Sequence, residues 1–181
     1  LIWCVFSCGP LALAMRSARL VQQVVGYSLN ADDLRVAIDR GVIDAAAATV
    51  ADAVRRADFV VLAVPVAVTR QVLQELAPWL RPDAIIMDVG STKQNVIAAA
   101  QEALGPHVGQ FVPAHPIAGK EVAGILHADP DLYRGRQVIL TPARSTRIGP
   151  LQQATSLWEA LGCRVITMDP QAHDATFAAV S

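Results

Sequence analysis

The sequence predicts a doubly wound α/β fold built on a mostly parallel sheet, and three observations support this. Short runs rich in β-branched residues alternate with longer helical patterns along the chain. Residues 60–64 and 84–87 are apolar at consecutive positions, which is typical of central strands covered on both faces. The chain has 181 residues, 53% of them hydrophobic, which is enough for one domain and the start of a second.

The chain opens on an apolar run, Leu1 to Phe6, which is too short to span a bilayer and lacks the basic flank of a signal peptide. We therefore expect a buried first strand, followed by a turn into a helix near Gly9. The later runs predict strands at residues 21–27, 59–64, 84–89, 110–114, 137–141 and 164–168. Each is followed by a segment with a different, longer periodicity.

Helices are predicted between these strands from their start and stop signals. Asn30 is a suitable N-cap for a helix over residues 31–40, and Gly41 is suited to its exit. A second helix, from residue 68 to 76, runs towards Pro78, which cannot continue it. Further helices are expected at residues 92–104 and 151–161, each followed by a glycine.

The domain boundary is predicted where the alternation of strand-like and helical segments stops. Residues 1–169 are predicted to form the α/β domain, and residues 170–181 to begin a helical domain. The chain starts without methionine and stops within an apolar helical pattern. We therefore expect it to be a fragment of a longer protein.

Composition excludes several classes of function. The net charge is −1 and the basic residues are scattered, so no basic stripe suits nucleic acid. Cys4, Cys8 and Cys163 form neither a CxxC pair nor a metal-type cluster. We expect no disulfide framework, no metal site, no membrane association and a reducing, cytoplasmic location.

Polar side chains follow the predicted strands at one edge of the sheet. Ser91 comes just after the run that ends near Val89, and His115 ends the next run and is followed by Pro116. In a doubly wound sheet, ligands bind outside the carboxyl ends of the strands. Ser91 and His115 should therefore meet in one crevice, together with Pro65.

A dinucleotide normally lies in the same crevice, with its pyrophosphate over a glycine-rich turn after the first strand. This chain keeps Gly9 at the strand-to-helix turn but has no spaced trio of glycines there. Gly9 alone is explained equally well by a plain turn.

The chain resembles the family of prephenate dehydrogenase and its arogenate or cyclohexadienyl relatives, the oxidative step towards tyrosine. The resemblance extends from about residue 11 to the last residue and covers six ordered motifs. These are VVGY at 24–27, GVID at 41–44, DFVVLAVP at 58–65, DVGSTK at 88–93, HPIAGKE at 115–121 and HD at 173–174.

The resemblance implies a Rossmann-type NAD(P) domain and an oxidative decarboxylation of prephenate, arogenate or both. A hydride leaves the ring carbon that bears the hydroxyl, and loss of the ring carboxylate makes the ring aromatic. His115 matches the family's catalytic histidine, and Ser91 the serine that orients it. Val64, Pro65 and Gly90 match positions beneath the cofactor.

The same resemblance implies substrate contacts at His173 and Gly119. It also implies that a helical domain, of which residues 170–181 are the beginning, binds the substrate carboxylates and makes a homodimer.

This chain departs from the family pattern at the cofactor turn and after the second strand. Aligned backwards from Arg16, the glycine-rich turn falls near Trp3, Val5, Cys8 and Gly9, so only the last position keeps a glycine. Either this end is not native sequence or cofactor affinity is impaired. Ser28 replaces the acid that binds the ribose of NAD, which leaves NAD and NADP open.

Other interpretations stay open. His115 could be a turn residue bonded to backbone, Ser91 only a helix N-cap, and His173 with Asp174 a surface pair at a helix start. The chain could instead be an NAD(P) oxidoreductase of the β-hydroxyacid dehydrogenase type, although those enzymes usually rely on a lysine. It could also be a non-catalytic remnant, which the missing glycines support.

Overall fold

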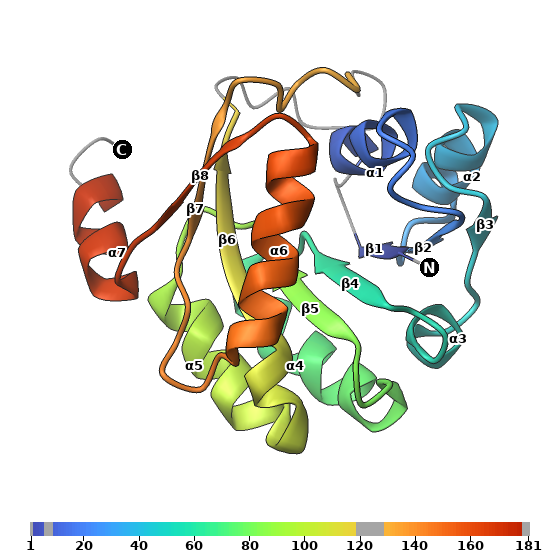
Figure 1. Cartoon of the computed structure of the whole chain (residues 1–181). Helices are drawn as coiled ribbons and strands as arrows, with labels where there is room; N and C mark the ends of the chain where they lie inside the picture. Colours follow the sequence, from blue (N-terminus) through green and yellow to red (C-terminus); the bar gives the residue numbers. More distant parts are fainter. Residues whose placement is uncertain (1, 6–8, 119–128, 179–181) are drawn as a thin grey trace.

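The chain forms one eight-stranded sheet flanked by helices over the residues that the computed structural model describes, which are 2–5, 9–118 and 129–178 (Figure 1). The strands lie in the order β3-β2-β1-β4-β5-β6-β7-β8. Their bounds are β1 Ile2–Val5, β2 Val24–Tyr27, β3 Ala45–Ala46, β4 Phe59–Leu62, β5 Ile85–Asp88, β6 Phe111–Ile117, β7 Gln137–Leu140 and β8 Arg164–Thr167.

Helices connect the strands and cover the sheet. They are α1 Gly9–Ser17, α2 Ala31–Asp39, α3 Val50–Val54, α4 Val66–Leu76, α5 Gln94–Ala103, α6 Ile148–Ala160 and α7 Pro170–Ala178, with short 3-10 helices η1 Ala77–Trp79 and η2 Gly105–Gln110. No helix in the described ranges is long and apolar enough to cross a membrane.

The predicted doubly wound, mostly parallel fold is confirmed. All pairings from β3 to β6 are parallel, and the chain order reverses on either side of β1. Strand β7 then runs antiparallel to β6, and β8 runs parallel to β7. Ligands of such sheets bind where the strand order reverses, at the carboxyl ends of the strands.

Both faces of the central strands are buried, as their continuous apolarity predicts. In β4, Phe59 and Val61 pack in one core with α1 and α6, whereas Val60 and Leu62 pack in a second core with α3, α4 and α5. Figure 1 shows α6 across one face and α4 and α5 towards the other. The alternation follows from the two-residue period of a strand.

Several helix ends follow their sequence signals. The Asn30 side chain accepts a hydrogen bond from the Asp32 backbone N–H, which confirms the predicted N-cap. Gly41 has φ +66°, a backbone conformation that suits glycine after a helix. Helix α4 ends at Leu76, two residues before Pro78, although it begins two residues earlier than predicted.

The prediction that the glycine-rich turn falls near Trp3 and Val5 was wrong, because the first strand includes both residues. Trp3 and Val5 both lie inside β1, where they pair with Val25 and Tyr27 of β2. They therefore do not occupy the turn that would face a phosphate. Gly9 begins α1 and is buried, and residues 6–8, including Cys8, lie outside the described residues.

Candidate functional site

Strand β6 changes partner along its length, and this places His115 at the carboxyl edge of the parallel sheet. Its first residues pair with β5, ending at Asp88 opposite Pro113. The next residues pair with β7, with His115 opposite Ile139. His115 therefore lies just beyond the end of β5, beside the loop that carries Gly90 and Ser91.

A buried ion pair between Lys93 and Asp88 lies at this edge of the sheet. The Lys93 side chain is 0% exposed, and its Nζ donates to Asp88 Oδ2 at 2.5 Å and to the Ala114 carbonyl at 2.7 Å. Asp88 Oδ2 also accepts the Gly90 N–H at 3.0 Å. Burial raises the pKa of the Asp88 carboxyl, and the Lys93 ammonium opposes that rise. The pair thus links the end of β5, the Gly90 turn and the residue before His115.

Helix α5 begins at Gln94, later than predicted, and its N-terminus is capped from 80 residues away. The backbone N–H groups of Lys93 and Gln94 donate to Asp174 Oδ1 and Oδ2, each at 2.9 Å. Ser91 lies before the helix rather than at its cap, so the reading of Ser91 as an N-cap was wrong. A carboxylate is well suited to this place because helix N-termini carry partial positive charge.

His115 is held in a chain of side-chain hydrogen bonds that reaches the same carboxylate. Its Nδ1 lies 2.9 Å from His173 Nε2, and His173 Nδ1 lies 2.8 Å from Asp174 Oδ1. His173 is 0% exposed. The Phe177 ring packs against both imidazoles, with centroids 4.8 Å from His115 and 4.7 Å from His173.

The surroundings keep His115 neutral at pH 7. Burial, then the positive charge of Lys93, then His173 lower the pKa of His115 to about 4, against the weaker opposing influence of Asp174. The His115 side chain is half-buried. A neutral imidazole with Nδ1 engaged can accept a proton at Nε2.

The predicted cofactor positions lie at the same edge, each just beyond a different strand. Gly9 begins α1 after β1, and Ser28 follows β2, where its Oγ accepts the Asn30 N–H at 3.1 Å. Val64 and Pro65 follow β4, with Pro65 exposed at the start of α4. Gly90 follows β5, and a Cβ added there would lie 3.3 Å from Asp88 Oδ2.

Ser91 is exposed in the loop between β5 and α5, next to the edge where His115 stands. Within the described ranges no hydrogen bond joins its hydroxyl to His115, whose Nδ1 faces His173. Its predicted orienting role stays a prediction. Gly119 lies outside the described residues.

The comparisons with known proteins decide the family. A family model described as "Prephenate dehydrogenase, nucleotide-binding domain" matches residues 11–167. The chain belongs to the prephenate dehydrogenase family.

Relatives in the prephenate dehydrogenase family match most of the chain. The prephenate dehydrogenase of Bacillus subtilis is 32% identical over 174 residues, which is 96% of this chain and 47% of the relative. The cyclohexadienyl dehydrogenase of Zymomonas mobilis is 39% identical over 130 residues, 72% of this chain and 44% of the relative. The chain thus spans about half the length of these relatives.

A crystal structure of the Aquifex aeolicus prephenate dehydrogenase, in complex with hydroxyphenyl propionate and NAD+, superposes with a TM-score of 0.92. The identity is 32%, and the match covers 99% of this chain and 63% of that one. The fold of the present chain is therefore that of the matched 63% of a family member.

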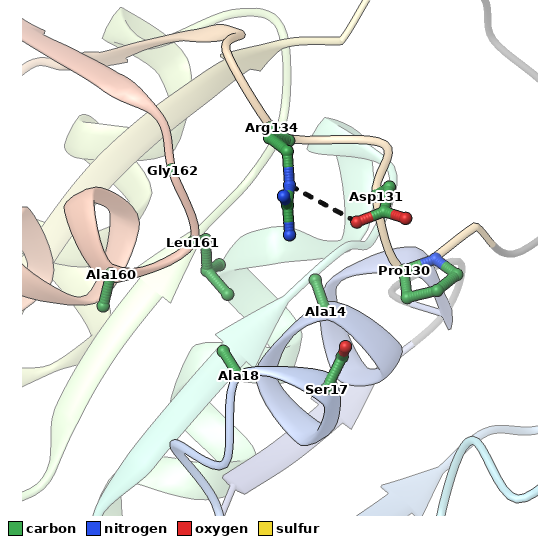
Figure 2. A pocket seen from close by; sticks show the side chains of 9 residues that line it. All are labelled: Ala14, Ser17, Ala18, Pro130, Asp131, Arg134, Ala160, Leu161 and Gly162. Carbon is green, nitrogen blue, oxygen red and sulfur yellow. Dashed lines mark ion pairs between the residues drawn. The ribbon is translucent and has the colours of Figure 1, made fainter.

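A pocket of about 270 Å³ lies elsewhere, at the opposite end of helix α1 from Gly9. Figure 2 shows the Arg134 side chain extending towards Ala14 beside its ion-pair partner Asp131, at 3.5 Å. The lining comes from the ends of α1 and α6 and from the loop before β7. In this member of the prephenate dehydrogenase family, the pocket is separate from the carboxyl edge that carries His115.

Sequence reasoning missed the structural roles of Lys93, Asp174 and Phe177. Lys93, five residues after Asp88, is 0% exposed and contacts the Asp88 carboxylate. The Asp174 and Phe177 contacts join segments about 60 to 80 residues apart, which periodicity cannot reveal. Among the described residues no cluster suited to a metal ion is found.

Proposed function

We propose that the protein containing this chain catalyses NAD(P)-dependent oxidative decarboxylation of prephenate, arogenate or both, the step that leads towards tyrosine. The observation that carries the proposal is the state of His115. It is a neutral, half-buried imidazole whose Nδ1 is engaged and which stands at the carboxyl edge of a doubly wound sheet. Family membership and the NAD+ bound to the Aquifex aeolicus relative support this reading.

The residues at the edge fit a dinucleotide in three respects. Helix α1 begins at Gly9, and the first turn of a helix suits a phosphate, although Pro10 contributes no N–H to it. At Gly90, Asp88 lies within 3.3 Å of where a Cβ would stand, so a side chain there would crowd the turn. Half-buried Ser28 could hydrogen-bond a ribose hydroxyl but brings no carboxylate that would reject a 2'-phosphate. We therefore propose that NAD and NADP both be tested as cofactors.

In the proposed chemistry, a residue of this chain accepts the proton of the substrate's ring hydroxyl. When bound, the nicotinamide supplies the acceptor for the hydride. His115 Nε2 accepts the proton of the ring hydroxyl as that carbon becomes carbonyl-like. The electron pair of the bond to the departing carboxylate then enters the ring and carbon dioxide leaves. The former carbonyl oxygen takes the proton back from His115 Nε2 and becomes the phenol hydroxyl.

Ser91 and Gly119 complete the proposal on the substrate side. We propose that the exposed Ser91 hydroxyl binds the substrate hydroxyl near His115. We keep the predicted substrate contact of Gly119 as a proposal as well. The predicted substrate contact of His173 stays a prediction, and both of its ring nitrogens already have protein partners.

Domain assignment, assembly and location are part of the same proposal. We propose residues 1–169 as the dinucleotide-binding domain and residues 170–181 as the start of a helical substrate and dimerisation domain. The whole protein is proposed to be a homodimer in the cytoplasm, in keeping with the free, buried thiol of Cys163. Small molecules are its proposed partners.

The proposal is tested by turnover of the whole protein with each pairing of prephenate or arogenate with NAD+ or NADP+. We expect at least one pairing to form reduced nicotinamide and carbon dioxide in equal amounts, because the mechanism couples the two losses. Oxidation without carbon dioxide release would favour an enzyme of the β-hydroxyacid dehydrogenase type. No turnover with any pairing would contradict the proposed function.

A further inference from the structure

The hydrogen bonds around His115 connect it through His173 to the carboxylate of Asp174. Burial acts to raise the pKa of the Asp174 carboxyl, but hydrogen bonds from Gln94, His173 and Lys93 together hold it below its ordinary value. Asp174 is therefore an ionised acceptor. The His173 Nδ1 that faces it at 2.8 Å must carry a hydrogen.

The next hydrogen bond joins His173 to His115. His173 Nε2 lies 2.9 Å from His115 Nδ1, so a single hydrogen lies between these two atoms. When His173 keeps its one ring hydrogen on Nδ1, its Nε2 is the acceptor and His115 Nδ1 is the donor. A neutral His115 that donates from Nδ1 has its free lone pair on Nε2, the atom assigned to accept the substrate proton.

We propose that Asp174 and His173 are positioning residues that fix the orientation and the tautomer of His115. This inference rests on the proposed function only for its effect on turnover. The hydrogen-bond chain Asp174–His173–His115 resembles in its logic the catalytic triads, in which a buried carboxylate holds an imidazole in its working tautomer. Here a second imidazole is inserted between the carboxylate and the base.

Two features keep the chain of groups rigid. Asp174 is fixed because it also accepts the N–H groups of Lys93 and Gln94 at the start of α5. His173 is wholly buried, and Phe177 packs on both imidazole rings. The charged and titratable groups that act on His115 in the described part of the chain are Lys93, His173 and Asp174. Of these three groups, His173 is the one whose side chain lies within hydrogen-bonding distance of His115 Nδ1.

The first test is Asp174→Asn, read by the ring-nitrogen chemical shifts of His115 and His173 in this chain. A neutral amide offers one oxygen where the two carboxylate oxygens accept three hydrogen bonds, so it holds the His173 Nδ1 hydrogen less firmly. We expect the wild type to carry hydrogen on His115 Nδ1 and the variant to carry part of it on Nε2. In the whole protein, kcat should fall roughly 10²- to 10⁴-fold, with the KM for the cofactor nearly unchanged.

Asp169→Asn is the matched control. Asp169 also caps a helix, because its Oδ1 accepts the N–H groups of Gln171 and Ala172 at 2.9 and 3.0 Å. No imidazole nitrogen is bonded to its carboxylate in the described residues. This variant should lose cap stability but keep the His115 tautomer and turnover.

The second test replaces His173 and stands even where Asp174→Asn fails to fold. In His173→Gln the amide oxygen can accept the His115 Nδ1 hydrogen, whereas His173→Leu offers no acceptor. We expect the glutamine variant to retain the tautomer and more turnover than the leucine variant. Wild-type tautomer and kcat in both His173→Leu and Asp174→Asn would overturn the positioning role. The proposed function fails separately, if His115 itself can be replaced without loss of turnover.

Discussion

Replacing His115 with asparagine is expected to lower turnover of the whole protein by roughly 10²- to 10⁴-fold. Asparagine keeps a hydrogen-bonding group but cannot take up a proton at neutral pH. Cofactor affinity should change little, since His115 lies beside the predicted cofactor positions but is assigned to the substrate hydroxyl. The measurement is kcat and KM under saturating cofactor, with a separate dinucleotide titration.

His107→Asn is the matched control for this substitution. His107 is also half-buried and bonded through Nδ1 to a side chain, Gln110, at 2.9 Å, but it lies in η2 before β6 begins. Its replacement should leave turnover near the wild-type value. Retained turnover in His115→Asn would contradict the assignment of the base.

The pH dependence of kcat/KM provides an independent signature of the same base. A base is active when unprotonated, and the pKa of His115 is lowered from 6.5 to about 4. Activity should therefore persist below the ordinary histidine range and decline only as the pH falls towards 4. An acid limb near 6.5 would contradict the lowered pKa.

Replacing Lys93 with methionine is expected to destabilise the fold by about 3–5 kcal/mol. The substitution removes the ammonium from a wholly buried pair and leaves the Asp88 carboxyl and the Ala114 carbonyl without that donor. The free energy of unfolding from urea titration measures this. A loss below about 1 kcal/mol would show that the pair contributes little.

The double variant Lys93→Met with Asp88→Asn is the control. Its neutral amide removes the stranded carboxylate but keeps an oxygen for the Gly90 N–H. We expect the double variant to be more stable than Lys93→Met alone, because the two effects are coupled. If the losses of stability caused by the two substitutions simply add, Lys93 and Asp88 do not stabilise the fold as a coupled pair.

Local patterns of the sequence predict most of the sheet and the edge at which the site lies. The β4 and β5 runs are apolar at successive positions because both faces are buried, and Asn30 and Gly41 mark the ends of α2 by their own chemistry. His115 follows from the run that ends beside it. These features depend on residues near one another in the chain.

What the sequence does not predict depends on contacts between distant segments. The start of α5 is set by Asp174, which no capping pattern near Gln94 indicates. Strand β7 pairs antiparallel with β6, which places Ile139 opposite His115. The composition of the two runs does not indicate this pairing. The register of the first turn also depends on pairing, which keeps Trp3 and Val5 within β1.

The central claim is that the carboxyl edge of this sheet binds a dinucleotide beside His115, although three glycines do not precede α1. Titration of this chain with NAD+ and with NADP+, followed by backbone amide and histidine ring signals, tests it most directly. We predict saturable binding of at least one dinucleotide, with the largest changes at Gly9, Gly90, Ser91 and His115. Absence of binding by either dinucleotide, or changes confined to residues away from this edge, would contradict the claim and favour a non-catalytic remnant.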